Sequence, residues 1–184
     1  MGFIGVLRLT TPDKTPRKAT GGEIWVMNHP SILDGSYLLK YVTNGTCIYK
    51  DQIGSNPLYG STAKLAQHIP NVGGPDMVRL ACEVLARGED LIIFPEGTRC
   101  TKADLSKFKS GFALIAKRSK AAINVMWMES PDDFMTREAP FWKVPQLTAE
   151  VDISRIERIE GGDCRSVRDI LERVKECYAE RASR

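Results

Sequence analysis

Short apolar runs with the character of β-strands alternate along this chain with segments that have the period of an α-helix. Five runs are rich in β-branched or aromatic residues, have the length of a strand and lie near turn signals. They cover residues 23–27, 45–50, 90–94, 121–128 and 146–153. Such alternation is typical of an α/β layer architecture. We therefore expect one α/β domain over residues 1–184, with helices packed on a central mixed sheet.

Segments between these runs are predicted to be helices. The clearest is residues 75–87, in which apolar side chains recur at the spacing of one helix face and Gly88 follows as a terminator. The apolar positions of that stripe are Met77, Leu80, Ala81, Val84 and Leu85. A helix from residue 30 to about residue 41 would begin with a proline, which the first helical position tolerates. Two more helices are expected at residues 111–119 and 166–178.

The composition is that of a folded protein without a membrane span. Hydrophobic residues make up 42% and charged residues 27%, and no run of 18 apolar residues occurs. The apolar start, residues 1–7, is too short for a signal peptide and lacks a basic leader. The five cysteines are irregularly spaced with no CxxC pair, which argues against a zinc site or a disulfide framework and favours the cytoplasm.

Positive charge is concentrated in one segment. The chain has a net charge of +3, but residues 99–120 contain seven basic residues and one acid, Asp104. Such a segment indicates an anionic partner, and a solvated helix face is the alternative. No interleaved aromatic residues or nucleic-acid module accompany it, so we do not expect a nucleic-acid partner.

Residues 28–34, NHPSILD, place one of the two histidines where a predicted strand gives way to a predicted helix. Asp34, in the first helical turns, can hydrogen-bond one ring nitrogen of His29, fix its tautomer and leave the other nitrogen free to take a proton. The two residues would then form a general-base dyad. A structural histidine is the alternative reading. Asn28 is expected to cap the helix or to hold the loop.

A second polar segment, residues 94–99, FPEGTR, follows the predicted strand 90–94. Ligands of open α/β sheets gather beyond the carboxyl ends of strands, and a turn with a glycine, a hydroxyl and an arginine suits a phosphate. We expect Glu96 to pair with Arg99 or a backbone N–H and so to order the turn. A tight surface turn with an ion pair is the alternative. Because both segments follow strands, they are predicted to share one rim of the sheet.

Together, the two segments resemble the glycerolipid acyltransferase superfamily, whose members carry an NHxxxxD block followed by an FPEGTR block. The resemblance covers about residues 24–128 and implies that family's fold, with residues 146–184 adding a strand and an amphipathic helix. Residues 47–74 resemble the second block, with Lys50, Pro57 and Gly60 at matching places. There are two departures: residues 69–72 lack the arginine that holds the acceptor phosphate in many members, and residues 121–125 lack a proline.

The resemblance implies an acyltransferase with no metal and no cofactor. His29, held by Asp34, would take the proton of an acceptor hydroxyl while that oxygen attacks the thioester of acyl-CoA or acyl-ACP. The residues implied in substrate binding are Asn28, Glu96, Gly97, Thr98, Arg99, Lys50 and Lys102. Arg99 would meet the acceptor phosphate, whereas Lys102, with Lys107 and Lys109, would meet donor phosphates or the acidic face of a carrier protein.

The predicted function is transfer of a fatty acyl group to a hydroxyl of a lysophospholipid acceptor, foremost 1-acylglycerol-3-phosphate. Such substrates place the protein in the cytoplasm or peripherally on the inner face of the membrane. The missing second-block arginine favours, as an alternative, a non-phosphate lyso-lipid or a specialised lipid or polyene acceptor. A non-catalytic lipid or carrier-protein binder is a third reading.

Overall fold

The structure is a computed structural model that describes residues 7–10, 22–31, 33–42, 44–50, 68–71, 73–100, 103–129 and 149–183. The strands are β1 (Leu7–Thr10), β2 (Ile24–Met27), β3 (Gly45–Lys50), β4 (Ile69–Asn71), β5 (Asp90–Ile93), β6 (Ile123–Glu129) and β7 (Ala149–Ile159). The helices are α1 (Asp34–Tyr41), α4 (Gly74–Ala86), α5 (Gly111–Ser119) and α6 (Val167–Ala182), with a 3-10 turn, η1 (Leu105–Lys107).

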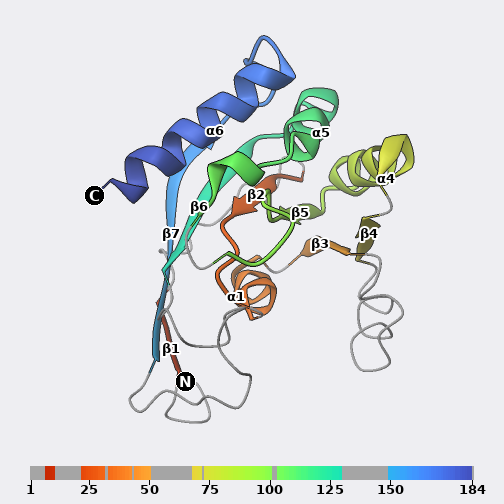
Figure 1. The fold of residues 1–184 in the computed structure, drawn as a ribbon. Helices are drawn as coiled ribbons and strands as arrows, with labels where there is room; N and C mark the ends of the chain where they lie inside the picture. Colours follow the sequence, from red (N-terminus) through yellow and green to blue (C-terminus); the bar gives the residue numbers. More distant parts are fainter. Residues whose placement is uncertain are drawn as a thin grey trace.

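These strands form one mixed sheet in the order β1-β7-β6-β2-β5-β3-β4 (Figure 1). Only β6 and β7 pair in antiparallel fashion within the described part of the chain, and the other neighbours are parallel. The predicted α/β class with a central mixed sheet is therefore confirmed. At the centre, Ile24 of β2 lies opposite Leu91 of β5 and Ile123 of β6. The carboxyl ends of β2 and β5 thus lie side by side, as the sequence predicted for the two polar segments.

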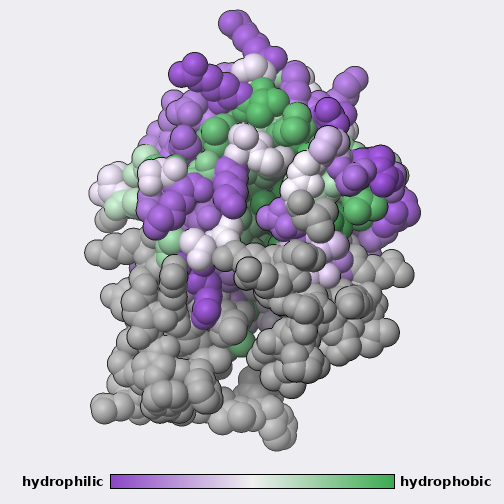
Figure 2. Space-filling view, turned by 45° about the vertical axis from the view of Figure 1, so that its right-hand side comes forward, coloured by the Kyte–Doolittle hydropathy of each residue, from purple (hydrophilic) through white to green (hydrophobic). Residues whose placement is uncertain are grey.

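Alternate residues of the central strands enter two separate apolar layers. Ile24 and Val26 pack in the layer that α4, α5 and α6 supply, whereas Trp25 and Met27 pack with α1 on the other face. Figure 1 shows the three helices on one side of the sheet and α1 on the other. In the space-filling view, hydrophilic side chains dominate the outward parts of the described residues, and hydrophobic ones lie between them (Figure 2). Burial on both faces explains why these strands read as continuous apolar runs.

Several elements differ from the sequence prediction. The first helix begins at Asp34 rather than at residue 30, and β7 continues to Ile159 rather than ending at residue 153. The extension of β7 is highly charged but pairs with β6, because an antiparallel strand can expose one face to water. Strands β1 and β4 were not predicted. The four-residue β1 begins only at the last residue of the apolar start, and the three-residue β4 contains Pro70, which disfavours a strand assignment.

Candidate active site

The predicted pair of His29 and Asp34 is present as a hydrogen bond. Nδ1 of His29 lies 2.9 Å from Oδ2 of Asp34, whose side chain is fully buried. The imidazole itself keeps 21% of its side-chain surface exposed. Because a buried carboxylate accepts at Nδ1, we assign the proton of the neutral ring to Nδ1. Nε2 is then the nitrogen with a free lone pair, as a general base requires.

Ser31 completes the environment of the buried carboxylate. Its backbone N–H donates to Asp34 Oδ2 at 2.8 Å, and its hydroxyl donates to Asp34 Oδ1 at 2.7 Å. These local hydrogen bonds compete with helical ones, which explains why α1 starts only at Asp34. Ser31 is 1% exposed, so it is not placed to act as a nucleophile. This supporting role was not predicted, although a serine three residues before an acidic residue at the start of a helix is the signal of a capping box.

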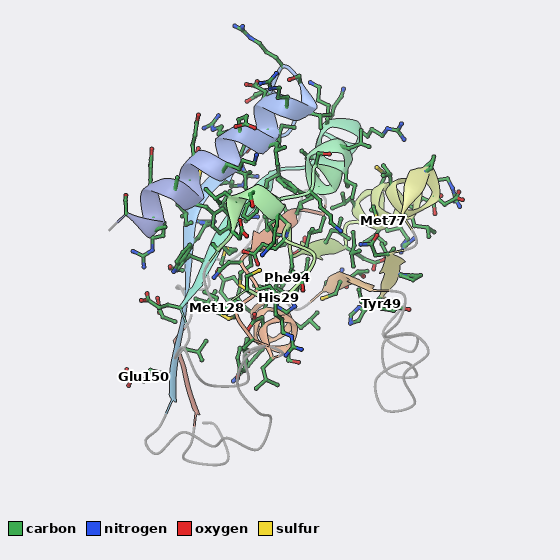
Figure 3. The ribbon with its side chains drawn as sticks, viewed as in Figure 1. His29, Tyr49, Met77, Phe94, Met128 and Glu150 are labelled. Atoms are coloured by element: carbon green, nitrogen blue, oxygen red, sulfur yellow. The ribbon has the colours of Figure 1, made fainter. Side chains whose placement is uncertain are left out.

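Asn28 holds the loop rather than capping the helix. Its amide Nδ2 donates to the Met128 carbonyl at 2.8 Å, and the Met128 N–H donates back to Asn28 Oδ1 at 2.7 Å. The side chain is 4% exposed. Asn28 is therefore tied to the end of β6, which agrees with the second of its two expected roles, whereas Leu33 occupies the cap position of α1 without a side-chain bond. In Figure 3, Met128 lies in the same region as His29 and Phe94.

The two polar segments meet at His29. The imidazole stacks on the ring of Phe94 with centroids 4.2 Å apart and planes 22° apart (Figure 3). The backbone N–H of Cys100, directly after FPEGTR, donates to the His29 carbonyl at 2.9 Å. The histidine is thus held by residues at both ends of the second segment, so the two segments form one site.

The FPEGTR turn depends on its glycine. Gly97 has a φ of +63°, and its N–H donates to the Phe94 carbonyl at 3.1 Å. L side chains rarely adopt that angle, so the backbone favours glycine here, and Nζ of Lys109 would lie 3.2 Å from an added Cβ. Lys109 is also tied to the turn through its N–H, which donates to the Pro95 carbonyl at 2.9 Å. The Lys109 ammonium therefore lies beside the FPEGTR turn, whereas the sequence had grouped Lys109 with the residues expected to meet the donor.

Glu96 was expected to pair with Arg99 or with a backbone N–H, and no ion pair joins it to Arg99 among the described residues. The Glu96 side chain is 2% exposed, and neither carboxyl oxygen has a hydrogen-bond partner among the described residues. Burial raises the pKa of Glu96 to about 7, against the smaller opposing influence of the Asp104 and His29 backbone N–H groups and the Cys100 thiol. The carboxyl points into the protein, so the turn is ordered by backbone hydrogen bonds instead.

The remaining predicted residues are only partly placed. Thr98 and Arg99 are half-buried in the turn, and Lys50 ends β3. Lys102, Pro57 and Gly60 lie outside the described residues. Lys107 forms a salt bridge with Asp104, since its ammonium lies 2.9 Å from Asp104 Oδ2.

Two surface hollows lie elsewhere in the described part of the chain. One of about 530 Å³ is bordered by α4 and Arg118, and one of about 300 Å³ lies at the amino end of β2 and β6 beside Glu23 and Arg158. Neither is lined by His29 or by the FPEGTR turn. Both hollows are lined by acidic and basic residues, so neither favours a purely anionic or a purely cationic ligand.

The profile of the family described as Acyltransferase matches residues 7–129, more than half of the chain. The chain belongs to this acyltransferase family. The matched region contains both polar segments and the strands β2 and β5 that present them, and the predicted resemblance to the glycerolipid acyltransferases is confirmed.

Curated relatives from distant organisms carry one name, 1-acyl-sn-glycerol-3-phosphate acyltransferase. The Helicobacter pylori protein is 32% identical over 114 residues, which cover 58% of this chain and 48% of the relative. The Cocos nucifera protein is 34% identical over 107 residues, covering 54% of this chain and 35% of the relative. The matches thus span less than half the length of these relatives.

A solved structure shares the fold. The 1-acyl-sn-glycerophosphate acyltransferase of Thermotoga maritima matches with a TM-score of 0.76 and 20% identity, over 97% of this chain and 73% of that one. The acyltransferase fold therefore includes elements of this chain beyond residue 129. Within the described residues, no helix combines the length and the hydrophobicity needed to cross a bilayer.

Proposed function

We propose that this acyltransferase moves a fatty acyl group from a thioester to a hydroxyl of a lysophospholipid, foremost 1-acylglycerol-3-phosphate. The observation that carries the proposal is the hydrogen bond of 2.9 Å between His29 and Asp34 at the rim where FPEGTR also lies. The names of the curated relatives support the same acceptor.

The reaction needs a base and no covalent enzyme intermediate. Nε2 of His29 accepts the proton of the acceptor hydroxyl while its oxygen attacks the thioester carbonyl. The tetrahedral intermediate collapses, the carbon–sulfur bond breaks, and the thiolate leaves with the proton that the imidazolium returns. Asp34 holds the ring and stabilises the imidazolium. General-base catalysis of this kind contributes about 10² to 10⁴ in rate, so positioning must supply the rest.

The acceptor phosphate fits the turn at Gly97. The Arg99 guanidinium and the Lys109 ammonium supply positive charge, and the Lys109 side chain lies against Gly97. Glu96 would repel a phosphate if it were fully ionised. Because burial raises its pKa to about 7, a large fraction of the Glu96 carboxyls is neutral near neutral pH.

The donor is acyl-CoA or acyl-ACP. Lys102 and Lys107 would meet donor phosphates or an acidic carrier protein, with Lys107 contributing less because it is paired with Asp104. A lipid acceptor would bring the protein to a membrane surface as a peripheral protein.

The sequence favours a second acceptor class in one respect. The segment that carries a phosphate-binding arginine in many members reads Ile69, Pro70, Asn71 and Val72 here. Its first three residues form β4 and contain no cation. A non-phosphate lyso-lipid or a specialised lipid acceptor would not need that arginine.

The acceptor class can be tested with matched substrates. The chain is incubated with acyl-CoA and either lysophosphatidic acid or the corresponding monoacylglycerol, and products are measured by mass spectrometry. We expect a preference of about ten-fold or more for the phosphate acceptor. Arg99→Gln should raise the KM for lysophosphatidic acid, whereas the exposed control Arg165→Gln should leave this KM unchanged. Equal use of both acceptors would refute the proposal that the acceptor carries a phosphate. Donor binding without any product would favour a non-catalytic lipid or carrier-protein binder.

A further inference from the structure

Tyr178 of α6 reaches the strand ends that carry the active site. Its side chain is fully buried, and its hydroxyl lies 2.8 Å from the Met126 carbonyl and 3.2 Å from the Val26 carbonyl. Val26 is two residues before Asn28 in the chain, although it is 152 positions from Tyr178. The Tyr178 hydroxyl therefore bridges β2 and β6 close to their carboxyl ends. His29 follows the end of β2, and Met128 lies near the end of β6.

The hydroxyl is placed to act as a donor. Burial, and next the charge of Glu96, raises the pKa of Tyr178 well above its ordinary value, so the group keeps its proton. The two hydrogen bonds therefore link α6 to both β2 and β6 close to the strand ends that carry the site.

The ring of Tyr178 supports the second segment. It contacts Phe108 edge to face, with centroids 5.2 Å apart and planes 81° apart, and Trp127 at 5.9 Å. Phe108 directly precedes Lys109, whose N–H donates to the Pro95 carbonyl. A movement of the tyrosine ring would therefore displace Phe108 and, through Lys109, the FPEGTR turn.

We propose that Tyr178 is a positioning residue for acyl transfer, which holds the ends of β2 and β6 and the chain at Phe108 so that His29 and the FPEGTR turn keep their mutual placement. Tyr178 lies beyond residues 7–129, which the family profile matches, and in this proposal the C-terminal helix is part of the active-site framework. The inference rests on the proposed role of His29.

The kinetic test is Tyr178→Phe, which removes the hydroxyl and keeps the ring. We expect kcat to fall about ten-fold with KM for donor and acceptor nearly unchanged, because displacements of about 1 Å are costly to catalysis. Val174→Ala is the matched control, since Val174 is fully buried on the same helix but its side chain has no group that can donate a hydrogen bond to the strands. It should lower the melting temperature and leave kcat within about two-fold.

A second readout does not require activity. The chain has two histidines, His29 and His68, so their ring signals can be assigned in nitrogen-resolved NMR spectra. Tyr178→Phe should shift and broaden the His29 ring signals and leave those of His68 unchanged. If the His29 signals move but the wild type transfers no acyl group, the proposed function fails while the positioning stands. Unchanged His29 signals, wild-type kcat in Tyr178→Phe, or an equal loss in Val174→Ala would overturn the inference.

Discussion

Replacing Glu96 with glutamine should change the pH dependence of stability by an amount that follows from its burial. The carboxyl is 2% exposed without a hydrogen-bond partner among the described residues, and its pKa rises from an ordinary 4.5 to about 7. The folded protein therefore binds a proton more tightly than the unfolded chain. Its stability contribution is fully present below pH 4.5 and is lost as the pH rises through about 7.

The magnitude follows from about 1.4 kcal/mol for each pKa unit. Between pH 5 and pH 8.5, the unfolding free energy of the wild type should fall by about 2 to 3 kcal/mol relative to Glu96→Gln. Urea denaturation at both pH values measures this difference. Glu176→Gln, an exposed change on α6, serves as the control and should show no such divergence. A difference between wild type and Glu96→Gln that stays constant to within about 0.5 kcal/mol would refute the argument from burial.

Further predictions concern the residues that surround the base. Asp34→Asn should lower kcat by about 10² to 10⁴ with retained donor binding, because an amide can donate to Nδ1 and reverse the tautomer of His29; steady-state kinetics would show it. Lys109→Ala should raise KM for a phosphate acceptor about ten-fold and leave that for the donor unchanged, and equal effects on both would contradict its place beside the turn. Asn28→Ala should lower the unfolding free energy by about 2 to 3 kcal/mol, since it leaves the buried Met128 backbone groups without partners; urea denaturation tests this.

The packing of helices on a central sheet and the pair of His29 and Asp34 were predictable because they depend on local patterns. Continuous apolar runs such as β2 and β5 signal strands that are buried on both faces. The five-residue spacing of His29 and Asp34 places them at one strand end, so their hydrogen bond follows from chain geometry. The shared rim followed from the position of both polar segments directly after strands.

The supports of the site were not predictable because they join distant parts of the chain. Asn28 and Met128 are 100 positions apart, and their pairing depends on the sheet order, which periodicity does not determine. The same holds for the reach of Tyr178 to Val26. Glu96 was expected to pair with Arg99 or with a backbone N–H, but its burial was not predicted, because the sequence does not show to which side the turn at Gly97 directs the carboxyl.

The imidazole of His29 is proposed as the base for acyl transfer. Thiol release from acyl-CoA in the presence of lysophosphatidic acid tests this role in the wild type, in His29→Ala and in the control His68→Ala, with donor affinity measured in parallel. We expect the rate to fall by about 10² to 10⁴ in His29→Ala with nearly unchanged donor affinity, and to be retained in His68→Ala. Thiol release at the wild-type rate in His29→Ala would rule out this histidine as the base.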